Sequence, residues 1–120
     1  MTDRADAVAR ERAATVARAA ALARQVEGLA EEQANTTHDD EHDPEGVTIG
    51  YARAQLQGLL AGARHDLEAL DRAAARLAEG TYGLCRRCGG PVAPERLDAL
   101  PAAETCIGCA GKLLPRQDRA

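Results

Sequence analysis

Apolar positions in the first third of the chain repeat at alternating steps of three and four residues. The positions of this seam are Ala5, Val8, Arg12, Thr15, Ala19, Leu22, Val26 and Leu29, of which Arg12 and Thr15 are the weak members. This is the spacing of the a and d positions of a coiled-coil helix. It predicts a helix over residues 3–34.

A second seam follows after a polar segment. Its positions are Ile49, Ala52, Leu56, Leu60, Ala63, Leu67, Leu70, Ala74 and Leu77, with one irregular step where Leu59 and Leu60 compete for the same place. The seam predicts a helix over residues 45–79. Asp43-Pro44-Glu45 is a good helix start, because proline fits the first helical position, and Gly80 is a good stop, because glycine accepts the left-handed conformation that follows a helix.

Two predicted helices of similar length, joined by a short polar segment, favour an antiparallel coiled-coil hairpin within one chain. The protein is therefore predicted to be mainly α and a monomer. The alternative is a pair of helices that associate between chains. The many alanines predict close helix approach with modest burial, and hence low stability of the hairpin alone.

The chain changes character after Gly80, where glycine and proline become frequent and all four cysteines occur. They are arranged as Cys85-x2-Cys88, a gap of 17 residues, and Cys106-x2-Cys109. Two residues between paired cysteines let one backbone turn direct both sulfurs at a single ion. We therefore expect one structural Zn²⁺ bound by these cysteines, with no coordination position left for water or substrate.

Other residues of this C-terminal region fit a zinc finger. Gly89, Gly90 and Gly108 are expected to adopt the positive φ that turns backbone N–H groups toward sulfur. The expected core is Val92, Leu97, Leu100, Ile107, Leu113 and Leu84, beside a short helix that begins at Pro94. Such a core is too small to fold about 35 residues, whereas zinc binding contributes about 10–16 kcal/mol in small fingers.

These patterns predict three parts of the chain. They are a coiled-coil hairpin over residues 1–80 with an acidic tip loop at 35–46, a C4 zinc finger over 81–114, and a frayed tail over 115–120.

The competing interpretation of the cysteines is a pair of disulfides or a redox-active Cys-x2-Cys. The N-terminus has no apolar segment typical of a secretion signal, and no run approaches the roughly 18 apolar residues of a membrane span. We therefore expect a cytoplasmic protein that does not bind membranes. Arg86 and Arg87, between the first two cysteines, favour the thiolate, so the redox sensitivity of the finger stays open.

Charge is distributed unevenly along the chain, whose net charge is −4. Eight acidic residues and no Lys or Arg lie between Gln25 and Ala52, whereas the remainder of the chain carries 15 basic and 11 acidic residues. This pattern favours a protein that brings negative charge to a positive or metal-containing target over one that wraps nucleic acid. His38 and His42 lie among these acids and offer a transient metal site, with solvated loop histidines as the alternative.

The C-terminal motif resembles a known family. Gly80-Thr-Tyr-Gly-Leu-Cys-Arg-Arg-Cys-Gly, then Pro-Glu-Arg-Leu-Asp-Ala-Leu-Pro and Cys-Ile-Gly-Cys109, is similar to the C4-type zinc finger of the DksA/TraR proteins, and the preceding hairpin agrees with their architecture. The resemblance implies a bacterial protein that binds RNA polymerase. In the family the coiled coil enters the secondary channel, its acidic tip reaches toward the catalytic magnesium, and the stability of initiation complexes changes, often together with ppGpp.

The resemblance also assigns the tip residues. The family tip has two aspartates three residues apart and an alanine two residues further on. Asp40 and Asp43 reproduce the aspartates, whereas Glu45 replaces the alanine and Pro44 stiffens the loop. We therefore expect Asp40, Asp43 and Glu45 to be the regulatory tip residues, and the involvement of ppGpp stays open.

Other classes of function compete with a polymerase-channel regulator. No nucleophile, general base or phosphate-binding loop stands out, so an enzyme is not expected. A zinc-ribbon adaptor that binds another protein is the main alternative. A DNA-binding finger is disfavoured because its basic residues are few and no aromatic platform exists for single strands, so sequence-specific nucleic-acid binding is not expected. A transcript-cleavage factor of the Gre type would share the acidic hairpin but needs no zinc.

Overall fold

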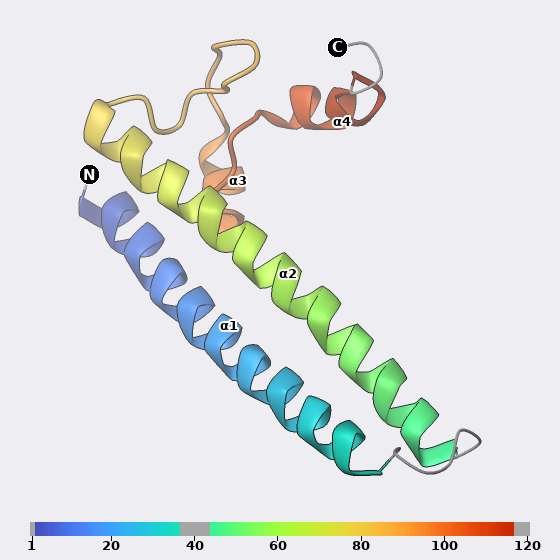
Figure 1. The fold of residues 1–120 in the computed structure, drawn as a ribbon. Coiled ribbons are helices and arrows are strands. Elements are labelled where there is room, and N and C mark those ends of the chain that lie inside the picture. Colours follow the sequence, from blue (N-terminus) through green and yellow to red (C-terminus); the bar gives the residue numbers. More distant parts are fainter. Residues whose placement is uncertain (1, 37–43, 117–120) are drawn as a thin grey trace. The chain divides into compact units, whose positions relative to one another are not determined.

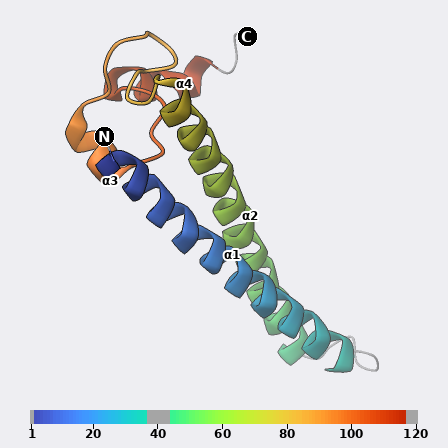
Figure 2. The same cartoon turned by 90° about the vertical axis from the view of Figure 1, so that its left-hand side faces the viewer.

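The computed structural model of the chain describes residues 2–36 and 44–116. The helices in this part of the chain are α1 (Thr2–Thr36), α2 (Pro44–Glu79), α3 (Pro94–Ala99) and α4 (Ile107–Arg116). The long helices α1 and α2 lie side by side and run in opposite directions (Figures 1 and 2). The fold is mainly α, with an antiparallel helical hairpin followed by the cysteine-containing finger, and the predicted fold class is confirmed.

The long helices begin and end within two residues of the predicted bounds. At the end of α2, Gly80 has a φ of +83°, and its N–H donates to the carbonyl of Leu77. The N–H of Thr81 donates to the carbonyl of Arg76 at 2.9 Å. This pair of bonds is a Schellman motif, which satisfies the last carbonyls of the helix and requires a left-handed residue. Gly80 is therefore the predicted stop. Among the described residues, no helix is long and apolar enough to cross a membrane.

The chain divides into two compact units. Unit 1 consists of residues 1–12 and 68–120, and unit 2 of residues 13–67. Each unit therefore contains a stretch of both long helices, and unit 1 also contains the whole cysteine region. The predicted division at residues 80 and 81 stays a prediction.

Unit 2 is a two-helix segment with an antiparallel register. Arg18 forms an ion pair with Asp66 at 3.2 Å, and Arg53 Nη1 donates to Gln33 Oε1 at 3.3 Å. Residues later in α1 thus pair with residues earlier in α2, as an antiparallel hairpin requires.

The buried residues of unit 2 belong to the predicted seams. They are Thr15, Ile49, Leu60 and Ala63. Leu60 is 8% exposed and Leu59 is 56% exposed, so Leu60 occupies the seam position at the irregular step. Thr15, a weak member of the seam by its chemistry, is completely buried.

Unit 1 contains a second part of the helix interface. Val8, Leu70 and Ala73 form a buried cluster, and Leu77, Tyr82 and Ala102 pack against it. Predicted seam positions that are exposed here are Ala5, Arg12 and Ala74. Ala73 is buried in place of Ala74 because Ala73 lies three heptads after Ala52 and resumes its register, whereas Ala74 continues the register of Leu60, which begins at the irregular step.

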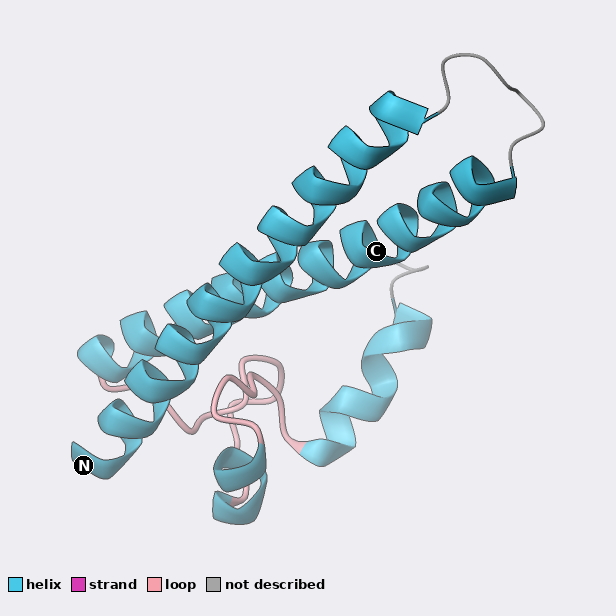
Figure 3. Ribbon diagram, turned by 90° about the horizontal axis from the view of Figure 1, so that it is seen from below, coloured by secondary structure: helices cyan, strands magenta, loops and turns pink. Residues whose placement is uncertain are grey.

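The finger contributes no strand among the described residues (Figure 3). Leu84 and Pro91 form an isolated antiparallel bridge. The short helix α3 begins at Pro94, as predicted. The interior of the finger is a cluster of Cys85, Val92, Leu97 and Cys109, against which Tyr82, Ala103 and Cys106 pack.

The predicted finger core was partly wrong. Val92 and Leu97 are buried, but Leu84, Leu100 and Ile107 are 45%, 51% and 78% exposed. The side chain of Leu113 lies outside the described residues. The reason is geometric, because cysteine side chains that converge on one point fill the interior of so small a finger themselves.

Candidate metal centre

The first cysteine pair lies in a loop closed by backbone hydrogen bonds. The N–H of Cys85 donates to the carbonyl of Gly90 at 2.7 Å, and the N–H of Gly89 donates to the carbonyl of Cys85 at 2.8 Å. Gly89 has a φ of +78°, which an L side chain rarely adopts. The tight turn between these bonds places Cys85 and Cys88 on the same side of the loop.

Backbone N–H groups of this first knuckle point at the sulfurs. Those of Arg87 and Cys88 donate to Cys85 Sγ, and that of Gly90 donates to Cys88 Sγ, all at 3.4 Å. Such donors stabilise a thiolate. Positive φ is found at Gly89 but not at Gly90 or Gly108. The prediction was wrong for those two, because Gly90 aims its N–H without it and Gly108 lies within α4.

The second cysteine pair is positioned by α4. Cys106 immediately precedes the helix and Cys109 lies in its first turn, where the N–H of Ala110 donates to the carbonyl of Cys106 at 2.8 Å. Free N–H groups at a helix start attract negative charge. The backbone hydrogen bond from Cys109 is the main cause that lowers the pKa of Cys106.

The ligand atoms of Cys85, Cys88, Cys106 and Cys109 all lie within 4.8 Å of one another. The Sγ atoms of Cys88 and Cys106 are 3.9 Å apart. A tetrahedral site with Zn–S bonds of about 2.3 Å requires about 3.8 Å between sulfurs. Cys85 and Cys109 are buried and Cys88 is exposed, and all of these cysteines are free thiols. The arrangement fits one structural Zn²⁺, as predicted.

The thiols of this cluster do not ionise alike. Burial raises the pKa of Cys85, but the N–H groups of Cys88, Cys106 and Arg87 outweigh it and lower this pKa to about 6. The side-chain hydrogen bond with Cys106, together with burial, raises the pKa of Cys109 to about 12. One thiolate therefore opposes ionisation of the next, and a divalent cation that compensates their charge would displace the remaining protons.

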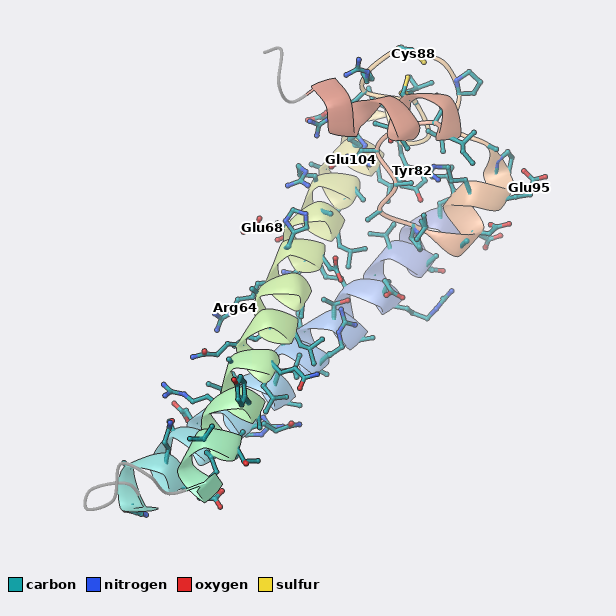
Figure 4. The ribbon with its side chains drawn as sticks, turned by 90° about the vertical axis from the view of Figure 1, so that its right-hand side faces the viewer. Arg64, Glu68, Tyr82, Cys88, Glu95 and Glu104 are labelled. Atoms are coloured by element: carbon teal, nitrogen blue, oxygen red, sulfur yellow. The ribbon has the colours of Figure 1, made fainter. Side chains whose placement is uncertain are left out.

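The carboxylate of Glu104, two residues before Cys106, binds three arginines. Glu104 accepts hydrogen bonds from Arg72 Nε at 2.6 Å, Arg86 Nη1 at 2.7 Å and Arg76 Nη1 at 3.4 Å. We call these four residues the Glu104 cluster. Figure 4 shows Glu104 beside the C-terminal turns of α2. Burial raises the pKa of Glu104, but the hydrogen bond and charge of Arg72, with the charges of Arg86 and Arg76, bring the pKa below its ordinary value.

The Glu104 cluster was not predicted from the sequence, because its members are spread over residues 72–104 without any periodicity. Arg86 was expected to favour the neighbouring thiolates. Its guanidinium forms an ion pair with Glu104, and its expected effect on the thiolates stays a prediction. No signal in the sequence distinguishes Glu104 from the other acidic residues of the chain.

Further contacts within unit 1 join the finger to the ends of the long helices. Arg4 of α1 forms an ion pair with Asp98 of α3 at 2.6 Å. The hydroxyl of Tyr82 donates to the carbonyl of Pro101 at 2.8 Å, and its side chain packs against both buried clusters of the unit. These contacts within unit 1 therefore connect the finger that holds the metal centre to the ends of α1 and α2.

The predicted tip residues lie in the sequence between α1 and α2 or in the first turn of α2. Asp40 and Asp43 lie outside the described residues, as do His38 and His42, and so does the side chain of Glu45. Their expected roles stay predictions.

The fold and the centre together define a C4 zinc-finger protein built on a helical hairpin. The family model described as "Prokaryotic dksA/traR C4-type zinc finger" matches residues 80–113. That segment contains all four cysteines and the whole Cys85–Cys109 spacing. Residues 80–113, which are less than a third of the chain, therefore match the dksA/traR C4-type zinc finger.

Two individual proteins are similar to parts or all of the chain. An uncharacterized protein of Aquifex aeolicus (strain VF5) is 41% identical over 44 residues, which are 37% of this chain and 30% of that relative. The similarity thus spans less than a third of the relative's length. The structure of transcription factor DksA2 from Pseudomonas aeruginosa has a TM-score of 0.57 and 24% identity, covering 98% of this chain and 88% of that one. The latter likeness concerns the fold.

Proposed function

We propose that this protein is a transcription regulator that binds RNA polymerase through the secondary channel and modulates initiation with its acidic tip. In this proposal Cys85, Cys88, Cys106 and Cys109 hold the zinc, and Asp40, Asp43 and Glu45 are the regulatory acids. The protein acts as a cytoplasmic monomer. It catalyses no reaction and binds neither membranes nor specific nucleic-acid sequences.

The observation that carries the proposal is the combination of a dksA/traR-type finger with a helical hairpin of DksA fold. Either part alone is common, because zinc ribbons and helical hairpins occur in many unrelated proteins. The charge pattern supports the same function. Eight acidic residues without a Lys or Arg lie in the stretch from Gln25 to Ala52, which includes the connection between the long helices.

Charge near a divalent ion gives such a tip a physical means of action. Two helices side by side are roughly 20 Å across, which suits a channel too narrow for a globular domain. A bound cation is commonly the largest local charge in a catalytic site. An added carboxylate therefore changes the energies of mobile groups around that ion more than it would in water.

A zinc-ribbon adaptor remains the second candidate, and one observation favours it. Exposed Leu100 and Ile107 line a mostly apolar groove on the finger, together with Pro91, Ala93, Glu95, Arg96, Ala99 and Cys106. Its volume is about 470 Å³. Exposed apolar surface of this kind is typical of protein-binding sites. An adaptor would use this groove and would not need the tip acids.

The tip acids separate the two candidates. We expect Asp40→Asn combined with Asp43→Asn to leave polymerase binding within about twofold of the parent while abolishing its effect on open-complex lifetime. Asparagine still caps a helix, so the start of α2 should be preserved. Binding is measured by pull-down of purified polymerase, and open-complex lifetime is measured with and without ppGpp.

The matched control is Glu27→Gln combined with Glu31→Gln, which removes two charges from exposed positions of α1 in the same acidic stretch. It should regulate like the parent. If the Asn variant regulates equally well, the tip acids are only a solvated turn. If the parent does not bind polymerase at all, the adaptor is favoured.

A further inference from the structure

Glu104 holds together segments that are distant in the sequence. Its side chain is 15% exposed, and its oxygens bind Arg72 and Arg76 of α2 and Arg86 of the first knuckle. A largely buried carboxylate with three cationic partners is uncommon, because burial of a charge is costly unless hydrogen bonds compensate it. Its position suggests that it serves the nearby metal centre.

Both knuckles are connected through this residue. Arg86 lies between Cys85 and Cys88, and its backbone N–H donates to the carbonyl of Glu104 at 2.8 Å, while its side chain binds the carboxylate. Glu104 itself lies two residues before Cys106. The backbone and the side chain of one residue thus set the spacing between the two halves of the centre.

The net charge of the Glu104 cluster is opposite in sign to that of a filled centre. Four thiolates around one Zn²⁺ leave a net charge of about −2. The three arginines and one glutamate of the cluster sum to a net charge of +2. Without the carboxylate, three cations would converge with no anion between them, and Arg76 is itself only 15% exposed. The carboxylate therefore lets the three cations converge, one of them from the loop between Cys85 and Cys88.

The same cluster reaches the end of α2. Arg76 donates from Nη1 to Glu104 and from Nη2 to the carbonyl of Ala103 at 3.4 Å. The carbonyl of Arg76 accepts the N–H groups of Thr81 and Tyr82 at 2.9 and 3.2 Å, which close the last turn of the helix. Movement of Glu104 would therefore shift Arg76 and disturb the hydrogen bonds that close the last turn of α2.

We propose that Glu104 is a positioning residue of the zinc centre. It holds the two knuckles in binding geometry and couples occupancy of the centre to the C-terminal turn of α2. This inference rests on the proposed ligand set of Cys85, Cys88, Cys106 and Cys109. Residues that orient metal ligands in this way typically change metal affinity by about 10–100-fold when they are replaced.

The test uses the full chain with Glu104→Ala, Glu104→Gln and Glu104→Asp. Zinc affinity is measured by competition with a chelator of known affinity, and the sulfur-to-metal charge-transfer bands of the Co²⁺-substituted proteins report whether all four thiolates still bind. We expect the Ala and Gln variants to lose zinc affinity by about tenfold or more. The Asp variant, which keeps the charge, should recover part of the loss. Arg72→Ala, which removes one exposed partner, should cause a smaller loss.

The coupling is measured by amide hydrogen exchange at Thr81 and Tyr82 with zinc at saturation. These amides should exchange about tenfold faster in the Ala and Gln variants than in the parent, while the Co²⁺ bands remain. Glu95→Gln is the matched control, because Glu95 is an exposed carboxylate of the same unit that forms no ion pair among the described residues. It should match the parent in both measurements.

Two results would overturn the inference. One is zinc affinity within about twofold of the parent in both the Ala and Gln variants, and the other is unchanged exchange at Thr81 and Tyr82 despite weaker zinc binding. A parent protein that binds no zinc would instead reject the ligand set. The two failures are therefore distinguishable.

Discussion

Units 1 and 2 contain stretches of the same two helices, yet they are stabilised in different ways. Unit 1 combines two buried clusters with ion pairs, the Tyr82 hydroxyl bond and the cysteine centre. Unit 2 buries Thr15, Ile49, Leu60 and Ala63 between α1 and α2. Two of these four residues are a threonine and an alanine, which bury little apolar surface.

The difference suggests that the two units of one hairpin respond differently to substitutions. Unit 1 depends on zinc binding, ion pairs and buried clusters together, so loss of one of these should weaken the others. Unit 2 depends on side chains along a seam, so single changes there should act locally and roughly in proportion to burial.

Removal of zinc should have the largest effect and should be confined to unit 1. Zinc binding contributes about 10–16 kcal/mol in small fingers, far more than the few apolar residues of this finger can replace. Chelation should unfold the finger while much of the helix in unit 2 persists, as measured by circular dichroism and residue-resolved amide exchange. A finger that stays folded after purification under reducing conditions with a metal content near zero would contradict this.

Acid should affect unit 1 before unit 2. Protons compete with zinc for thiolates, so zinc affinity falls as the pH falls. Glu104 acts in the same direction: its pKa in the folded protein is below the ordinary 4.5, so its contribution is present above that value and is lost as the pH falls through the folded pKa. Between pH 7 and 4, zinc release should accompany loss of finger structure before helix is lost in unit 2. Zinc release and ellipticity measured on the same titration check the order, and simultaneous loss of both units would contradict it.

A pair of neighbouring leucines tests the seam of unit 2. Leu60→Ala should lower the free energy of unfolding by about 2–3 kcal/mol, because it removes a buried side chain from the interface. Leu59→Ala is the control and should change it by no more than about 0.5 kcal/mol, since Leu59 is 56% exposed. Urea unfolding followed by circular dichroism measures both. Equal effects would mean that the two leucines share the interface.

Glycines in α2 and at its end should give the smallest effects, with opposite signs in the two units. Gly58 lies inside the helix, and a Cβ added there would meet no neighbouring side chain within 4 Å, so Gly58→Ala should stabilise unit 2 by about 0.5–1 kcal/mol. Gly80→Ala should destabilise the end of α2 by about 1–2 kcal/mol, because Gly80 has a φ of +83°. Thermal unfolding of the zinc-bound proteins gives both changes. A stabilising Gly80→Ala would exclude the left-handed stop.

Much of the fold follows from local rules. The seams, Pro44 and Gly80 predicted the bounds of the long helices, since each of these signals acts through its own backbone or through neighbours one turn away. The cysteine spacing predicted the metal centre for a similar reason, because a two-residue gap sets the distance within each pair.

The errors arose where side chains compete for space or charge. Ala73 replaced Ala74 in the interface, because the heptad register of Ala52 resumes past the irregular step at Leu59 and Leu60. Leu100 and Ile107 were expected inside the finger, but Cys85 and Cys109 fill that space. A hydrophobic residue type indicates that burial is favourable, but it does not indicate whether room exists.

The sequence by itself determined the elements of this protein: the two long helices, the polar segment between them and a finger with four zinc-binding cysteines. Tertiary structure decided which positions meet, including the choice of Leu60 over Leu59 and the assembly of Arg72, Arg76 and Arg86 around Glu104. The physical reason is the separation along the chain over which each interaction acts. Helix signals and cysteine spacing act over a few residues, whereas an ion cluster forms only when the folded backbone brings distant charges within hydrogen-bonding distance.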